Sequence, residues 1–166
     1  MKIITALIIF LLLYLAHFVY PIRAEMREMT LKELTEGAQA IVLGKVEKKE
    51  SKKDEKGNIF TYVTFNAEKY IKGDTGKDRV TIRYLGGCIN DVCQSSGDDP
   101  SFEVNEKALV FLKKLTADDN IYTVPAMFQG VIAADKDIHF SEKLLQVIAL
   151  QPGTVPQQDY GWMGDN

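Results

Sequence analysis

Cys88 and Cys93 are the only two cysteines of the sequence, and they are its clearest candidates for covalent chemistry. Their C-x4-C spacing is neither the C-x2-C of thiol–disulfide exchange nor half of a usual zinc site, and no third cysteine completes one. Gly86 and Gly87 come directly before Cys88, so we expect the backbone to bend there. Two cysteines in an oxidising compartment normally pair. The sequence therefore predicts a structural disulfide across a loop or a hairpin tip.

Few other residues have the types and spacing that acid–base or metal chemistry needs. His17 lies in an apolar N-terminal run, which leaves His139 alone, and a lone histidine is more often a surface residue than a ligand. There is no nucleophile elbow, phosphate-binding glycine loop or second histidine for a triad. The acidic pairs lack the Asp-x-Asp-x-Asp-Gly spacing of a calcium loop; they are Asp98 with Asp99, Asp118 with Asp119, and Asp135 with Asp137. The sequence predicts no enzyme, no cofactor and no metal site.

The first 24 residues predict export. Lys2 precedes an 18-residue apolar run from Ile3 to Tyr20, and Ala24 is a small residue before a plausible cut. This order is typical of a secretory signal peptide. Because a run of about 18 apolar residues is also long enough to span a membrane, an uncleaved anchor over residues 3–20 remains the alternative. Both alternatives predict that the rest of the protein is secreted or periplasmic. It would contact a membrane only if the leader is uncleaved.

The exported part is acidic. Without residues 1–24 the chain keeps 18 lysines and arginines against 23 aspartates and glutamates, a net charge of −5. Nucleic acids bind basic faces, because their phosphates must be neutralised. We therefore expect no nucleic-acid partner.

Residues 25–151 are expected to form one mainly β domain, because 166 residues leave little room for a second core. A short helix opens this domain. Thr30 is its predicted N-cap, Glu33 the capping-box partner of Thr30, and Gly37 the point where the helix ends.

Alternating apolar and polar residues predict the strands that follow. Alternation over Phe60–Ala67 and Val80–Tyr84 indicates half-buried strands, and the unbroken apolar run Ala108–Leu112 indicates a strand buried on both faces. Gly44 suggests a bulge or a close backbone approach within its strand. The mixed-charge run Glu47–Gly57 indicates a solvated loop. Further strands are predicted at 38–48, at 120–124, and at 128–133 with a bulge at Gly130. Phe102 is expected to open another strand, and Asn105 with Glu106 to form a turn after it.

The C-terminal part is predicted to hold a helix and a tail. Ser141–Leu150 fits an amphipathic helix with Ser141 as N-cap, which we favour over a final strand. Residues 152–166 have no periodicity and should form a flexible tail. Tyr160 and Trp162 in this tail are candidate partner-binding residues, although a tryptophan packed against the domain explains the same pattern.

Several segments together resemble a known family. In order they are TLKELTEGAQAIVLGKVEK, IFTYVTFNAEKYIKGD, VTIRYLGG, FEVNEKALVFL and YTVPAMFQGVI. They look like the small exported β module of uncharacterised bacterial proteins that is often found ahead of secreted matrixin-type metalloproteases. The helix and strand order also resembles the netrin-like fold of tissue metalloprotease inhibitors. No cysteine lies near Glu25 to act as in those inhibitors, so the resemblance does not imply protease inhibition.

The expected fold is an OB-like (netrin-like) barrel with a short N-terminal helix, with a β-sandwich as the alternative. The predicted function is a non-catalytic module that binds a protein or other partner in the periplasm or at the cell surface. Tyr62 and Tyr70 could form an exposed aromatic platform for it, although aromatic side chains on strands usually pack. The alternative is a small extracytoplasmic hydrolase with an unidentified carboxylate site. A deep pocket lined by converging acidic side chains would favour the enzyme. An exposed groove or apolar patch would favour the binding module.

Overall fold

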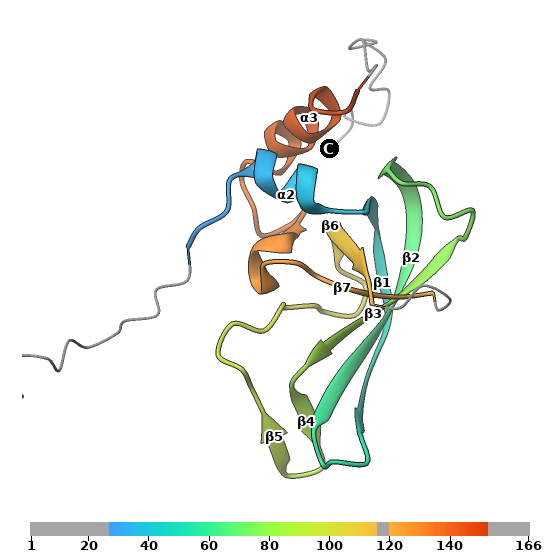
Figure 1. Ribbon diagram of the computed structural model, residues 1–166, viewed down its shortest axis with the longest axis vertical. Coiled ribbons are helices and arrows are strands. Elements are labelled where there is room, and N and C mark those ends of the chain that lie inside the picture. The colour runs from blue at the N-terminus through green and yellow to red at the C-terminus, as the bar shows by residue number, and fades with distance from the viewer. Residues whose placement is uncertain (1–26, 116–119, 153–166) are drawn as a thin grey trace, which may run out of the picture.

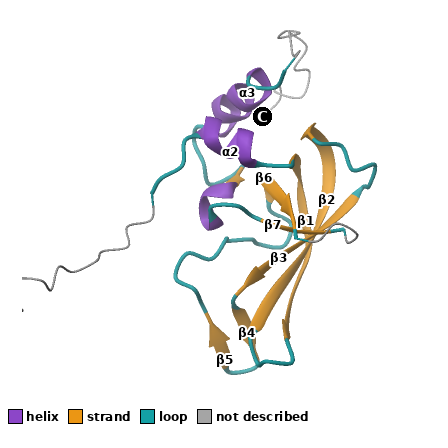
Figure 2. Ribbon diagram, in the orientation of Figure 1, coloured by secondary structure: helices purple, strands orange, loops and turns teal. Residues whose placement is uncertain are grey.

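The computed structural model describes residues 27–115 and 120–152, which form a mainly β domain with helices gathered at one end (Figures 1 and 2). The leader, Asp118 and Asp119, and the tail residues Tyr160 and Trp162 lie outside the described residues. Within the described ranges, no helix has both the length and the apolar composition needed to cross a membrane.

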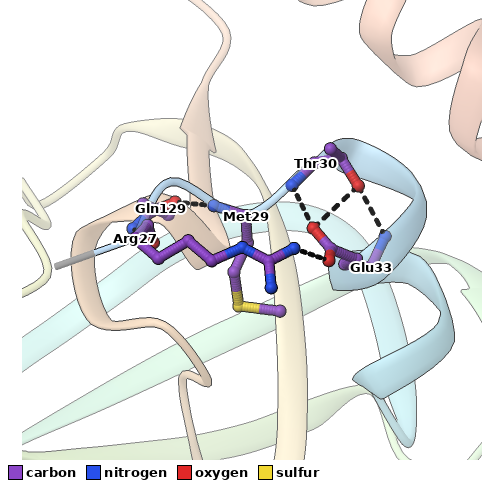
Figure 3. Close-up of polar contacts among 5 residues, drawn as sticks. All are labelled: Arg27, Met29, Thr30, Glu33 and Gln129. Atoms are coloured by element: carbon purple, nitrogen blue, oxygen red, sulfur yellow. Dashed lines mark hydrogen bonds and ion pairs between the residues drawn. The ribbon is translucent and has the colours of Figure 1, made fainter.

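The first described helix, α2, spans Leu31–Gly37 and has the predicted capping box. The Thr30 hydroxyl accepts a hydrogen bond from the Glu33 backbone N–H at 3.2 Å, and the Glu33 carboxylate accepts one from the Thr30 N–H at 2.8 Å (Figure 3). Two N–H groups that the first helical turn leaves unpaired are thus satisfied, which allows so short a helix to begin here. The predicted start and end of this helix are confirmed.

The segment before α2 is attached to a distant part of the chain (Figure 3). The Met29 N–H donates to the Gln129 side-chain oxygen at 2.7 Å, and the Gln129 amide donates to the Arg27 carbonyl at 3.4 Å. Gln129 belongs to the 3-10 helix η1, Met127–Gly130. Arg27 also pairs with Glu33 on α2. The chain therefore enters the domain at its helical end.

Two 14-residue strands, β1 (Ala40–Lys53) and β2 (Ile59–Lys72), pair along most of their length. The prediction of a solvated loop over Glu47–Gly57 was wrong, because β1 continues through this charged run to Lys53. Its side chains stay in water while its backbone pairs with β2, which composition alone does not reveal. The connection between β1 and β2 is a short turn that begins at Asp54. The Asp54 carboxylate accepts hydrogen bonds from the N–H groups of Lys56 (3.0 Å) and Asn58 (2.8 Å).

Gly44 lies at a register shift where β1 and β2 come unusually close. A Cβ atom at this position would lie 2.1 Å from the Asn66 carbonyl oxygen and 2.7 Å from the Phe65 ring. The predicted close backbone approach at Gly44 is confirmed.

The six-stranded sheet has pairings that return to their starting point. Neighbouring strands follow the order β1-β2-β3-β7-β6, and β6 pairs back with β1 over Ala40–Lys45. The β3–β7 pairing is parallel, and the other pairings are antiparallel. The strand β8 pairs with β6 outside this ring. The remaining bounds are β3 Arg79–Leu85, β6 Lys107–Lys114, β7 Ile121–Thr123 and β8 Val131–Ala133.

The strand β6 separates two apolar cores, as expected of a strand buried on both faces. Ala108, Val110 and Leu112 point into the ring core, which also contains Val63 and Phe65. Leu109 and Phe111 point the other way, into a second core beneath the helices α2 and α3. All five residues from 108 to 112 are fully buried. Successive side chains on opposite faces thus join ring and helices into one unit.

The predicted disulfide is present. Cys88 and Cys93 face each other across a small hairpin, formed by β4 (Gly87–Ile89) and β5 (Val92–Gln94), with an S–S distance of 2.04 Å. This hairpin lies at the end of the molecule opposite the helices (Figure 1). A disulfide is consistent with an oxidising, extracytoplasmic location.

Removing the disulfide should weaken the fold moderately. Because the bond closes a loop of only six residues, we expect the double variant Cys88→Ser/Cys93→Ser to lose about 2 kcal/mol of unfolding free energy. Urea denaturation of the oxidised protein and the variant measures this difference. An unchanged denaturation midpoint would contradict this prediction, and so would two alkylatable thiols found by mass spectrometry in the protein purified without reductant.

Phe102 does not open a strand, contrary to prediction, since β6 begins only at Lys107. The Phe102 side chain is instead fully buried in the ring core, with its ring centroid 6.1 Å from that of Tyr84. A buried aromatic residue in an irregular segment looks like a strand residue in the sequence. The predicted turn at Asn105 is confirmed by its positive φ of 73°.

Two further predictions near the C-terminus were only partly correct. Gly130 ends η1 and is not a bulge within a strand, and the strand β8 begins after it. The helix α3 spans Phe140–Ala149, with His139 and not Ser141 at the N-cap position. The His139 side chain makes no capping bond, so burial of Phe140, Leu144 and Val147 fixes this helix.

Candidate functional site: an aromatic and cationic face of the sheet

Asp99, Asp137 and His139, which the sequence singled out, make contacts within a loop and at the start of a helix. Asp99 accepts hydrogen bonds from the backbone N–H of Ser96, at 3.2 and 3.3 Å. Asp137 accepts from the Lys143 ammonium at 2.5 Å, and this bond is the largest cause of the lowered pKa of Asp137. The His139 Nδ1 lies 3.4 Å from the exposed Glu142 carboxylate. No group of three or more potential metal ligands lies together in the described parts of the chain.

Two cavities of the described domain have mixed polar and apolar linings and do not bring carboxylates together. One, of about 400 Å³, lies where the loop after β2 meets β6 and β7, and Asp74 is the carboxylate among its described lining residues. The Asp74 carboxylate already accepts the Gly76 N–H at 2.7 Å. The other, of about 350 Å³, is lined by Tyr84 and Asp99 among others. Neither cavity has the paired acids that general acid–base chemistry uses.

Tyr62 and Tyr70 do not form a common platform, contrary to one interpretation of the sequence. The Tyr70 ring packs against the ring core, and its hydroxyl bonds to the Thr75 hydroxyl and the Lys77 carbonyl, both at 2.7 Å. Register shifts between β1 and β2 interrupt the simple alternation of faces along β2. Tyr62 therefore lies on the outer surface without Tyr70.

The outer surface of β1–β3 instead gathers a different set of side chains. Cross-strand pairing places Lys52 opposite Phe60, and Glu50 opposite Tyr62, which is itself opposite Arg83 on β3. The intervening residues of β2, Thr61 and Val63, are buried on the inner side. We call this surface the aromatic–cationic face; it consists of Lys48, Glu50, Lys52, Phe60, Tyr62 and Arg83.

Arg83 is held against the aromatic rings of this face. Its guanidinium carbon lies 3.9 Å from the Phe60 ring centroid and 5.9 Å from that of Tyr62. The Lys52 ammonium lies 5.6 Å from the Tyr62 centroid. Each close cation–π contact contributes roughly 0.5–1 kcal/mol at an exposed site. The rings thus orient two cations on the surface of the sheet.

Most cations of this region have a carboxylate partner. Glu50 accepts a hydrogen bond from Lys48 at 3.0 Å and lies 3.6 Å from Lys52; the Lys48 bond is the main reason that the pKa of Glu50 is lowered. Arg79, at the start of β3, pairs with Glu47 at 2.6 Å. Surface pairs of this kind exchange readily with other anions, because water and salt screen them.

Arg83 differs from these cations. Among the described residues no carboxylate pairs with it, and its buried Nε atom has no hydrogen-bond partner. Buried polar atoms in proteins are almost always satisfied, so the unpaired Nε is unusual, and burial leaves only the terminal nitrogens of Arg83 for an incoming group. A guanidinium fixed on a ring but lacking an anion is suited to accepting one from outside.

The disulfide-linked hairpin supports this face from the inner side. The Thr61 hydroxyl donates to the Gly86 carbonyl at 2.7 Å and lies 3.0 Å from the Ser51 hydroxyl. The Ile59 N–H donates to the Gln94 side-chain oxygen at 2.8 Å. These bonds attach both ends of the hairpin to the strands that carry Phe60 and Tyr62. The face is therefore built on a rigid element.

The sequence signals for this site were present but incomplete. Alternation placed Phe60 and Tyr62 on one side of their strand and Arg83 on one side of the next, yet register between the two strands is not readable from alternation alone. Comparison with protein-family models and with curated proteins found no match for the chain.

Proposed function

We propose that this chain is an exported, OB-like (netrin-like) β module that binds a partner without catalysing a reaction, in the periplasm or at the cell surface. The OB-like assignment is supported by the closing strand order β1-β2-β3-β7-β6 and by the parallel β3–β7 pairing. The resemblance to modules found ahead of matrixin-type proteases agrees with it.

The observation that carries the binding proposal is the aromatic–cationic face. Aromatic and arginine side chains are enriched at the energetic centres of binding surfaces. Here Phe60 and Tyr62 present partly exposed rings on the outer surface of the sheet, and Arg83 lies over Phe60 and near Tyr62 with no carboxylate partner among the described residues. An exposed strand surface of this kind suits contact with a macromolecule better than enclosure of a small substrate.

Export is supported by two independent features. The leader has the order of a secretory signal, and the exposed Cys88–Cys93 pair is oxidised. Exposed disulfides persist in secreted and periplasmic proteins and are rare in the cytosol. The proposed site of action is therefore outside the cytoplasm.

Site-specific crosslinking tests the binding proposal. A photo-crosslinking phenylalanine analogue replaces Thr64, which pairs with Lys48 at the border of the aromatic–cationic face. As a control it replaces Lys32 on α2, whose side chain is 68 % exposed. In living cells that produce the protein naturally, we expect covalent adducts from position 64 and none from position 32. Adducts from neither position, or the same adducts from both, would contradict a binding role of this face.

A further inference from the structure

We propose that the partner of the aromatic–cationic face is an extended, acidic segment of another protein, one of whose carboxylates pairs with Arg83. The inference rests on the proposed function and specifies its ligand. It is carried by the only cation of the face that has no carboxylate among the described residues.

The first step concerns the state of Arg83. The guanidinium carbon lies 3.9 Å from the Phe60 ring centroid, which holds the group over the ring, and the buried Nε cannot be reached by solvent or ligand. The terminal nitrogens remain for an incoming group. A guanidinium group that is already held in place loses less conformational entropy when it pairs with an anion. Its planar shape also lets it bind a carboxylate through two parallel hydrogen bonds.

The second step concerns whether the Phe60 and Tyr62 rings have a free face on which a ligand could stack. Arg83 covers Phe60, and Lys52 and Arg83 both lie near Tyr62. Stacking of sugars or nucleic-acid bases requires a free ring face. Because cations already lie over these rings, the face is arranged to present charge, and the ligand it recognises is an anion.

The third step concerns charge. The aromatic–cationic face together with Arg79 and Glu47 has four basic side chains (Lys48, Lys52, Arg79 and Arg83) and two acidic ones (Glu47 and Glu50), in a chain whose part after residue 24 has a net charge of −5. A positive region on a negative protein attracts acidic partners and orients their approach. Complementary charge therefore favours a negatively charged partner at this surface.

The fourth step concerns the backbone of the ligand. Arg79 and Arg83 are four residues apart on β3, a distance of roughly 13 Å along a strand, which equals four residues of an extended peptide. Leu85 follows on the same side and is 40 % exposed, so the cationic row ends at an apolar side chain. A segment with carboxylates and an apolar residue matches this row better than a uniformly charged polysaccharide.

Calorimetric titration tests the proposal with three polyanions of matched charge: poly-L-glutamate, polygalacturonate and an oligothymidylate. We expect the oxidised protein to bind poly-L-glutamate at least tenfold more tightly than the other two. Arg83→Gln should weaken this binding at least tenfold and Arg83→Lys severalfold, because lysine keeps the charge but not the fork. Lys32→Gln, which removes an exposed cation from α2, should leave it unchanged.

The outcomes separate the ligand class from the proposed function. Tighter binding of polygalacturonate or oligothymidylate, no binding of poly-L-glutamate, or equal binding by Arg83→Gln would each overturn the acidic-segment proposal. Crosslinking from position 64 in cells would still support the binding function in those cases. Circular dichroism shows whether each variant is folded, and if Arg83→Gln is not, the folded Arg83→Lys protein decides by whether its affinity falls.

Discussion

Replacing Gly44 by alanine should lower the free energy of unfolding by about 3 kcal/mol or prevent folding altogether. The new Cβ atom would lie 2.1 Å from the Asn66 carbonyl oxygen and 2.7 Å from the Phe65 ring. The oxygen is backbone of the paired strand β2, so it cannot rotate away as a side chain would. Relief requires the two longest strands to separate, at a cost at the upper end of that for overpacking.

Gly37→Ala is the matched control for this prediction. Nothing lies within 4 Å of a Cβ atom at Gly37, which is the last residue of α2. Alanine favours the helix by up to about 1 kcal/mol over glycine, so this variant should be neutral or slightly stabilised. Chemical denaturation compares the two variants. If Gly44→Ala is as stable as Gly37→Ala, the close approach of β1 and β2 is not as the structure has it.

Truncating Glu106 should produce the second large loss, about 3 kcal/mol. Its side chain is only 3 % exposed, its carboxylate lies 2.7 Å from the Lys136 ammonium, and it accepts the Glu103 N–H at 3.0 Å. The Glu106 bond is also the main reason that the pKa of Lys136 is raised. A hydrogen bond to a charged group contributes about 1.5–3 kcal/mol, and Glu106→Ala removes one such bond together with one ion pair and leaves a cavity.

Glu103→Ala tests whether the loss of unfolding free energy in Glu106→Ala results from the burial of Glu106 and not from its charge alone. Glu103 pairs with the same lysine at 3.0 Å, but its side chain is 68 % exposed. Exposed ion pairs contribute at most about 1 kcal/mol, so this variant should be nearly as stable as the wild type. Equal losses for Glu103→Ala and Glu106→Ala in urea denaturation would show that the buried position of Glu106 has no special importance.

Local signals in the sequence predicted local structure well. The capping box at Thr30 and Glu33, the turn at Asn105 and the pairing of Cys88 with Cys93 each depend on residues close together in the chain. The unbroken apolar run at 108–112 also predicted burial on both faces, because a strand that lies between two cores has apolar side chains on both sides.

Features that depend on distant residues were not predicted. The extension of β1 to Lys53 follows from pairing with β2, and the burial of Phe102 follows from space left inside the ring. The stacking of Arg83 on Phe60 depends on strand register, which the pattern of apolar residues does not define on a solvent-exposed face. Such a face is therefore visible only once strands are paired.

The contact between Gln129 and the segment before α2 also determines orientation. It brings the incoming chain to the helical end, whereas Phe60 and Lys52 lie near the turn at Asp54 and the disulfide-linked hairpin, at the other end (Figure 1). The point where the described chain begins and the aromatic–cationic face therefore lie toward opposite ends of the domain. A partner bound at this face would leave the helical end and the segment before α2 uncovered.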